Sequence, residues 1–134
     1  MAGNRMTKIA AKDVASNRRR GGDLRTLLSP ATAGATSGFM GVLTLEPGEA
    51  VTEHYHPYSE EFLYLVRGAV TALVDGEPEP LAAGDALHLR PHVRHRLENR
   101  GTEPAFMVFQ LGPLAPRPEL GHVDTEPLPD QESV

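Results

Sequence analysis

The sequence predicts an all-β protein whose strands form a sandwich or barrel. Glycine and proline recur at short intervals through the middle of the 134-residue chain. The segments between them are too short, and too rich in β-branched and aromatic residues, for typical helices. Asp75-Gly76 supplies residues that are favoured at the tip of a hairpin. Evenly spaced short strands favour a sandwich or barrel, and we expect them at 24–28, 39–45, 51–56, 62–67, 70–74, 86–90, 93–99 and 105–111.

The length fits one domain with two flanking segments. Residues 23–112 hold all the expected strands. Residues 1–22 form a basic arm, expected to be solvated and to pack on a partner subunit; a targeting or nucleic-acid-binding arm is the alternative. In residues 113–134 prolines alternate with acids, which predicts an acidic tail without regular strand or helix, draped over the barrel.

Composition excludes several functions. A net charge of −5 argues against nucleic acid as a partner, because neutralising phosphates requires an excess of Lys and Arg. The absence of cysteine removes disulfides, thiolate nucleophiles and Cys-ligated metals, so a metal must use His, carboxylate or amide ligands. No apolar run approaches the roughly 20 residues that span a bilayer, and no secretory signal is visible. We therefore expect a cytoplasmic protein with no membrane partner.

Clustered histidines indicate a site. Five of the six histidines lie between residues 54 and 95. In a strand, His54 and His56 point to the same face and can approach one ion, although this pair alone is also compatible with a surface or packing role. Glu61 opens the returning strand, where a carboxylate can complete the set. Period-two alternation sends His95 inward, and a buried imidazole needs a partner, which a metal can supply.

These residues resemble the two motifs of the cupin superfamily. Gly48, His54-Tyr55-His56, Glu61 and Gly68 have the spacing of the first motif. The second motif is matched by the residues Gly84, Asp85, His95 and Asn99. It departs from the pattern where Arg90 and His92 stand at the proline and glycine positions. The resemblance implies a single-domain cupin, a small jelly-roll β-barrel, with His54, His56, Glu61 and His95 as metal ligands.

A narrower resemblance, covering about residues 18–125, is to the cupin-type polyketide cyclases of bacterial aromatic polyketide pathways, the tetracenomycin, resistomycin and spore-pigment type. It is carried by the segments 18–23, 35–41, 54–68 and 87–92. It implies aldol-type cyclisation and aromatisation of a poly-β-ketone, with a divalent metal as the Lewis acid that stabilises the enolate. Zinc is the expected metal, and the ligand types also accept iron, nickel and manganese.

Catalytic roles are expected for His54 and His95 at the metal. The general base is expected to be either a metal-bound hydroxide or His88, whose imidazole titrates near neutral pH. The alternation of Leu87 and Leu89 would turn His88 outward, but a place for His88 in the pocket stays open at this point. Further candidate pocket residues are Gln110, Tyr64 and Arg90.

Partners are predicted from the same patterns. The substrate is expected to be a small-molecule polyketide. An acyl carrier protein that contacts Arg90, Arg94 and Arg96 is the candidate for presenting it, and a solvated strand face is the alternative for these arginines. Residues 62–66 and 105–111 are apolar on both faces, which predicts a homodimer. Two other functions remain open, a metal-dependent dioxygenase and a non-catalytic small-molecule-binding cupin.

Overall fold

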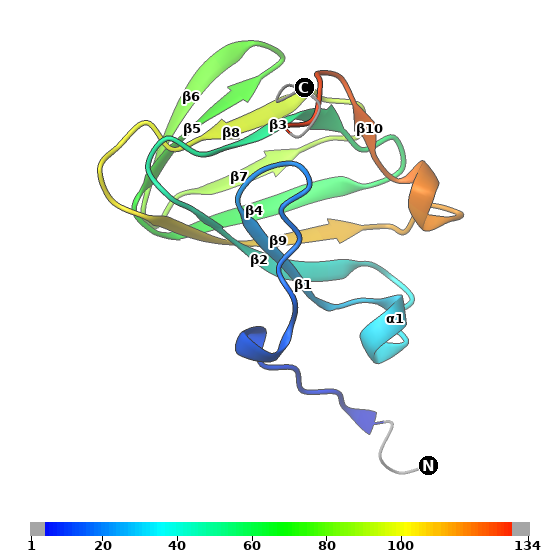
Figure 1. Ribbon diagram of the computed structural model, residues 1–134. Helices are drawn as coiled ribbons and strands as arrows, with labels where there is room; N and C mark the ends of the chain where they lie inside the picture. Colours follow the sequence, from blue (N-terminus) through cyan, green and yellow to red (C-terminus); the bar gives the residue numbers. More distant parts are fainter. Residues whose placement is uncertain (1–4, 130–134) are drawn as a thin grey trace.

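The computed structural model describes residues 5–129 and contains two five-stranded antiparallel sheets that face each other (Figure 1). One sheet has the strand order β1-β2-β9-β4-β7 and the other β10-β3-β8-β5-β6. The strands are β1 Asp23–Leu28, β2 Phe39–Leu45, β3 Ala50–Tyr55, β4 Glu60–Arg67, β5 Ala69–Val74, β6 Glu77–Ala82, β7 Ala86–Leu89, β8 His95–Glu98, β9 Ala105–Gly112 and β10 Val123–Asp124. This is the small jelly-roll barrel that the motifs imply, so the predicted fold class is confirmed.

Helical structure is minor. The α-helix α1, Pro30–Ala33, lies between β1 and β2, and short 3₁₀ turns occupy η2, Ala11–Asp13, and η3, Pro118–Leu120. Within residues 5–129, no helix is long and apolar enough to cross a membrane.

The core lies between the two sheets and follows the alternation of the strands. In β9 the residues Ala105, Met107, Phe109 and Leu111 are buried, whereas Gln110 is exposed. In β4, Leu63 and Leu65 point inward between exposed neighbours. The structure therefore decides the orientation of β9, which the sequence had left open because both faces are apolar.

Strand β6 was not predicted, because Pro78 and Pro80 disfavour a strand. The structure resolves the conflict by placing β6 at the edge of its sheet, where it pairs only with β5. An edge strand has one side without ladder hydrogen bonds, so alternate prolines, which lack the N–H, are tolerated there.

The expectation that the tail has no regular structure is wrong for the described part of it. Between Pro118 and Pro127 the chain forms η3 and then β10, which pairs with β3 through Val123 opposite Tyr55 and Asp124 opposite His54. The prolines flank β10 and do not interrupt it. The remaining tail residues, 130–134, lie outside the described residues.

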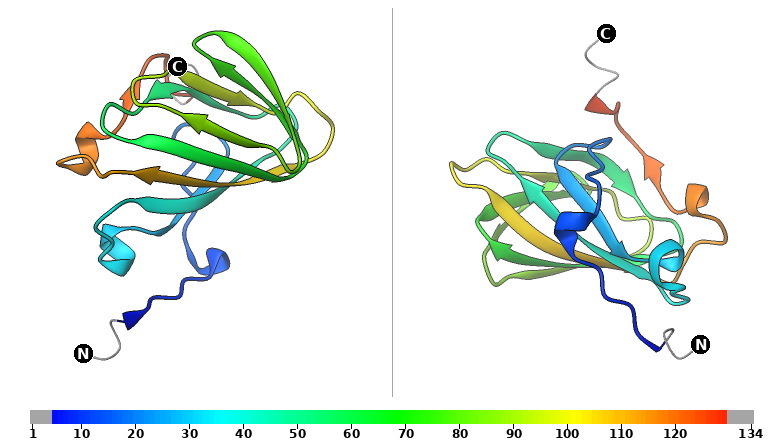
Figure 2. Two further views of the ribbon diagram at one scale, coloured as in Figure 1. Left: turned by 180° about the vertical axis from the view of Figure 1, so that it is seen from behind. Right: turned by 60° about the horizontal axis from the view of Figure 1, so that its bottom comes forward.

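The end of the basic arm is tied to the barrel, while the segment before η2 projects away from it (Figure 2). The Thr52 amide donates a 2.9 Å hydrogen bond to the Arg20 carbonyl, and Asn17 forms a β-bridge with Leu24. Gly21 has φ +104°, and a Cβ there would collide with the Ala50 carbonyl oxygen. Only glycine allows the chain to pass β3 this closely. Packing of the arm on a partner subunit stays a prediction, and residues 1–4 lie outside the described part.

Candidate metal centre and its pocket

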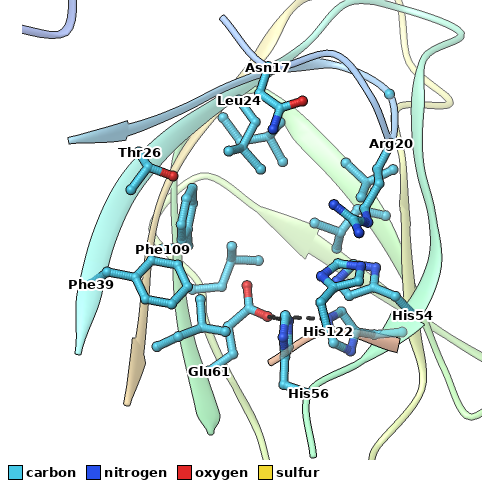
Figure 3. Close-up of a pocket in the computed structure, with 17 residues that line it drawn as sticks. Asn17, Arg20, Leu24, Thr26, Phe39, His54, His56, Glu61, Phe109 and His122 are labelled. Atoms are coloured by element: carbon cyan, nitrogen blue, oxygen red, sulfur yellow. Dashed lines mark ion pairs between the residues drawn. The ribbon is translucent and has the colours of Figure 1, made fainter. Parts of the chain in front are cut away.

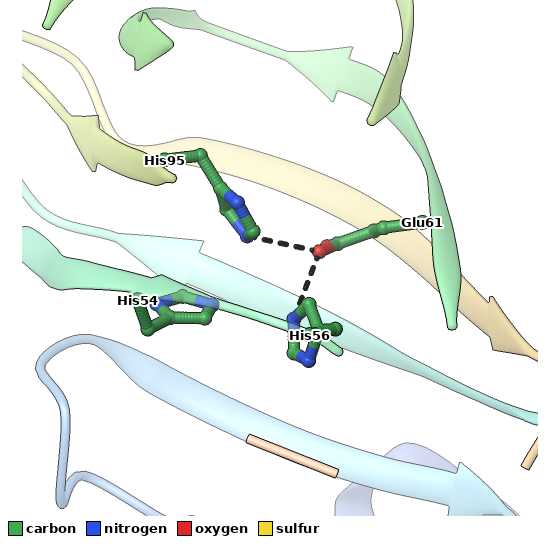
Figure 4. A group of neighbouring side chains, drawn as sticks. All are labelled: His54, His56, Glu61 and His95. Atoms are coloured by element: carbon green, nitrogen blue, oxygen red, sulfur yellow. Dashed lines mark ion pairs between the residues drawn. The ribbon is translucent and has the colours of Figure 1, made fainter. Parts of the chain in front are cut away.

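Four of the predicted site residues meet at one end of the barrel (Figure 4). His54 is in β3 and pairs across the ladder with His95, the first residue of β8. His56 follows the end of β3, and Glu61 lies in β4 of the opposite sheet. One potential ligand atom from each residue lies within 4.8 Å of those of the others. The antiparallel register therefore brings together side chains from both sheets.

The orientation of each imidazole is set by a backbone carbonyl. The Nδ1 atoms of His54, His56 and His95 hydrogen-bond the carbonyls of Thr52, Gly121 and Val93 at 2.8, 3.0 and 3.0 Å. A carbonyl only accepts, so each Nδ1 carries the proton and each Nε2 presents a lone pair. This tautomer is the one that a metal bound at Nε2 requires.

The cluster contains acceptors without a matching donor. Glu61 Oε1 lies 3.3 Å from His56 Nε2 and 3.2 Å from His95 Nε2. Glu61 Oε1 and His95 Nε2 are both buried and lack a hydrogen-bond partner among the described residues. Buried acceptors that face one another require a positive species between them. Three neutral imidazoles and one carboxylate fit a divalent cation of the zinc or iron type.

The pKa shifts report the same crowding. Burial and the neighbouring rings of His95 and His122 lower the pKa of His54 to about 3, so this ring stays neutral. Burial acts to raise the pKa of Glu61, but the contacts with His56 and His95 outweigh it and lower that pKa. For His95, burial acts to lower the pKa, but the Glu61 carboxylate outweighs it and raises the pKa above its ordinary value. A proton on His95 and a divalent cation are therefore alternative ways to satisfy the cluster, and they compete.

The four residues line one side of a cavity of about 220 Å³ (Figure 3). Apolar side chains form much of the remaining wall, including Phe39, Leu63 and Phe109. Polar side chains enter from the chain ends, namely Asn17, Arg20 and His122. A small apolar chamber with a few polar groups on one side is typical of a site for a small organic molecule.

His122 is a pocket residue that the sequence-based prediction missed. Its ring stacks on His54 with centroids 4.3 Å apart and an interplanar angle of 14°. Burial and the Arg20 guanidinium lower the pKa of His122 to about 4. One signal in the sequence could have indicated this pocket residue. His122 and Asp124 are two residues apart, like His54 and His56, and would share one face of a strand.

The other predicted pocket residues lie outside this cavity, and their assignment to it is corrected. In β7, Leu89 is buried and His88 is exposed, so the alternation of the strand turns His88 to the outer face. There His88 Nε2 lies 2.6 Å from Glu60 Oε1, and its ring packs against Phe62. Tyr64 and Gln110 share that outer face.

The arginines predicted at the pocket mouth do not line the cavity either. Arg90 is exposed just after β7. Arg96 is bound to Glu98 and Glu126, each at 2.7 Å, and is therefore already neutralised.

The chain is similar to cupin proteins in sequence and in fold. The family model "Cupin domain" matches residues 41–110. Protein SchB of Streptomyces halstedii is 60% identical over 118 residues, which cover 88% of this chain and 86% of that protein. The tetracenomycin polyketide synthase protein TcmJ of Streptomyces glaucescens is 56% identical over 123 residues, covering 92% and 83%. The structure of the polyketide cyclase RemF from Streptomyces resistomycificus shares the fold, with TM-score 0.73 and 16% identity over 93% of this chain and 89% of that one.

Proposed function

This chain belongs to the cupin family, and on that premise we propose that it is a metal-dependent polyketide cyclase. The reaction is the aldol-type cyclisation and aromatisation of a poly-β-ketone. The observation that carries the proposal is the convergence of three imidazole Nε2 atoms and the Glu61 carboxylate beside an apolar cavity. The similarity to TcmJ, a tetracenomycin polyketide synthase protein, and to RemF, a polyketide cyclase, supports the substrate class.

The chemistry of a poly-β-ketone matches this site. Its methylenes are flanked by two carbonyls, so cyclisation requires one carbon to lose a proton, its enolate to be stabilised, and a distant carbonyl to come within reach. When bound, a divalent cation supplies Lewis-acid stabilisation of the enolate oxygen. His54, His56, Glu61 and His95 would hold that cation, and zinc is the metal we propose.

The chain's own residues contribute orientation and exclusion of water. The carbonyls of Thr52, Gly121 and Val93 hold the three rings in one tautomer before substrate arrives, so no reorganisation is needed there. Phe39 and Phe109, packed edge to face with centroids 6.4 Å apart, form a rigid wall of the cavity. An apolar wall keeps water from the enolate and favours a folded over an extended substrate chain.

The test combines metal analysis with product analysis. Freshly purified protein should contain zinc. Adding this protein to a minimal polyketide synthase should change the product profile without oxygen consumption. His95→Ala should lose both metal and activity while remaining folded, because none of the four ligands belongs to the apolar core that joins the two sheets. His88→Ala is the matched control, since it removes an imidazole on the outer face and should keep metal and activity.

Different results in the same experiments would support a dioxygenase or a non-catalytic binding protein instead. Iron with oxygen consumption would support a dioxygenase, because the same ligands suit iron(II). An unchanged product profile with metal-loaded protein would contradict both enzymes and leave a binding protein. Full metal content in both His95→Ala and His54→Ala would contradict the ligand assignment.

We also propose that the protein is a homodimer. Phe62, Tyr64 and Val66 of β4 are 47%, 48% and 44% exposed on the outer face. A row of large apolar side chains favours burial against another surface, and a second copy of the chain presents the same row.

A further inference from the structure

The cavity contains a fourth imidazole, His122, that the cation cluster does not explain. His122 belongs to the segment between η3 and β10, outside the residues that the family model matches. Its ring lies nearly parallel on the face of His54 and meets His56 edge to face with centroids 5.2 Å apart (Figure 3). His122 is not part of the group whose ligand atoms converge. It therefore lines the chamber beside the metal centre without joining it.

The two nitrogens of His122 differ in their surroundings. Nε2 lies 3.1 Å from Asp124 Oδ1, and because a carboxylate only accepts, Nε2 carries the proton and donates. In the neutral ring Nδ1 is then an acceptor, and no hydrogen bond to it is formed by residues 5–129. The ring thus presents one lone pair that the protein leaves unused.

Asp124 is itself held in place from the other end of the chain. The Arg20 guanidinium donates to both of its oxygens, at 2.8 and 3.3 Å. Arg20 is positioned in turn by the Thr52 amide, which binds its carbonyl, and by the close passage at Gly21. Side chains from opposite ends of the chain therefore form one hydrogen-bonded network. It runs from Arg20 through Asp124 to His122, which lines the cavity.

We propose that His122 is a substrate-binding residue whose Nδ1 accepts a hydrogen bond from an enol or phenol hydroxyl, with Asp124 and Arg20 as positioning residues. This inference rests on the proposed function, since poly-β-ketones enolise and their aromatised products are phenols. A ketone or ether oxygen cannot donate to Nδ1, so the residue distinguishes the hydroxyl form from an oxygen that lacks a proton. The barrel supplies the cation site, and the chain ends supply this recognition.

Ligand binding tests the inference directly. Naphthoresorcinol carries two phenolic hydroxyls, and its dimethyl ether has the same ring system but no donor. Titration calorimetry with zinc-loaded protein should show tighter binding of naphthoresorcinol. His122→Phe keeps an aromatic ring against His54 and removes both nitrogens, so the preference for the hydroxyl compound should fall about five-fold, the effect of one hydrogen bond. Asp124→Leu should reduce it as well, because the ring loses its orientation.

Controls separate this role from a structural one. Arg18→Met removes another arm arginine, which pairs with Glu49 at 3.3 Å and does not line the cavity, and should leave the preference unchanged. Metal content should stay complete in His122→Phe. A crystal structure of the wild-type complex should place a hydroxyl within hydrogen-bonding distance of Nδ1, and this measurement does not depend on a variant folding.

The outcomes distinguish the two proposals. An undiminished hydroxyl preference in folded His122→Phe, or a complex in which no hydroxyl approaches Nδ1, overturns the role of His122 even if the wild-type protein is a cyclase. Conversely, a hydroxyl preference that depends on His122 in a protein that changes no polyketide product supports the binding role and contradicts the cyclase.

Discussion

At position 92 a histidine adopts a backbone conformation that glycine favours. His92 has φ +72°, at the place where the cupin motif carries glycine, and its amide donates a 2.9 Å hydrogen bond to the His56 carbonyl. The turn before His95 therefore keeps the shape that the motif requires, at the cost of a strained residue. His92→Gly should raise the free energy of unfolding by about 1 kcal/mol, measured by chemical denaturation.

The matched control for this effect is Asp75→Gly. Asp75 also has a positive φ, 50°, but its side chain accepts a 3.1 Å hydrogen bond from the Arg94 amide. Glycine would relieve strain there and remove that bond, so little net gain is expected. If His92→Gly and Asp75→Gly raised the free energy of unfolding equally, backbone strain at His92 would not be the cause of the stabilisation.

At the scale of elements, the arm depends on one glycine. Gly21→Ala should lower the free energy of unfolding by about 2 kcal/mol, because it combines an unfavourable φ with a collision against β3. Gly34→Ala, after α1, has φ +66° and open space around the added methyl, so only about 1 kcal/mol of backbone strain is expected. An equal loss of unfolding free energy in Gly21→Ala and Gly34→Ala would contradict this, because it would mean that the arm shifts away from β3 without an energetic penalty.

The tail is held to the barrel by carboxylates, which makes its attachment sensitive to acid. Burial acts to raise the pKa of Asp124, but Arg20 outweighs it, so that pKa lies below its ordinary 3.8. Glu126 of the tail also binds Arg96 of β8, at 2.7 Å. A lowered pKa stabilises the folded state above the ordinary value, and this contribution is lost as pH falls through the folded pKa.

We therefore expect the tail to loosen before the barrel as the solution is acidified below pH 3.8. The Thr125 amide, which donates to the Glu53 carbonyl at 3.0 Å, should lose hydrogen-exchange protection. The Leu65 amide, bound to the Asp85 carbonyl at 3.0 Å inside the barrel, should keep it and serves as the reference. Simultaneous loss at both amides would mean that tail and barrel unfold together.

For the whole molecule, the outer face of β4 predicts the state of assembly. Tyr64→Glu places a charge in the exposed apolar row, so light scattering should show the mass of one chain where the wild-type protein shows two. Ala82→Glu adds the same charge on the exposed edge strand β6 of the other sheet and should leave the dimer intact. A wild-type mass of one chain at all concentrations would contradict the dimer.

The sequence by itself was sufficient for features that depend on short-range alternation and motif spacing. Strand periodicity predicted the inward direction of His95, and the resemblance to the cupin motifs implied a cluster of ligands whose atoms the structure brings within 4.8 Å of one another. Such features are predictable because neighbouring residues in a strand have a fixed geometric relation.

Only the tertiary structure decided the rest. The alternation of Leu87 and Leu89 already favoured an outward His88, and the structure adds that its ring lies there against Phe62 and beside Glu60. The place of β6 at a sheet edge explains its prolines. The contact of Arg20 with Asp124 joins residues 104 positions apart, and β10 forms only where it meets β3. Pairings at such separations leave no periodic trace in the sequence, because they depend on how the whole chain folds back on itself.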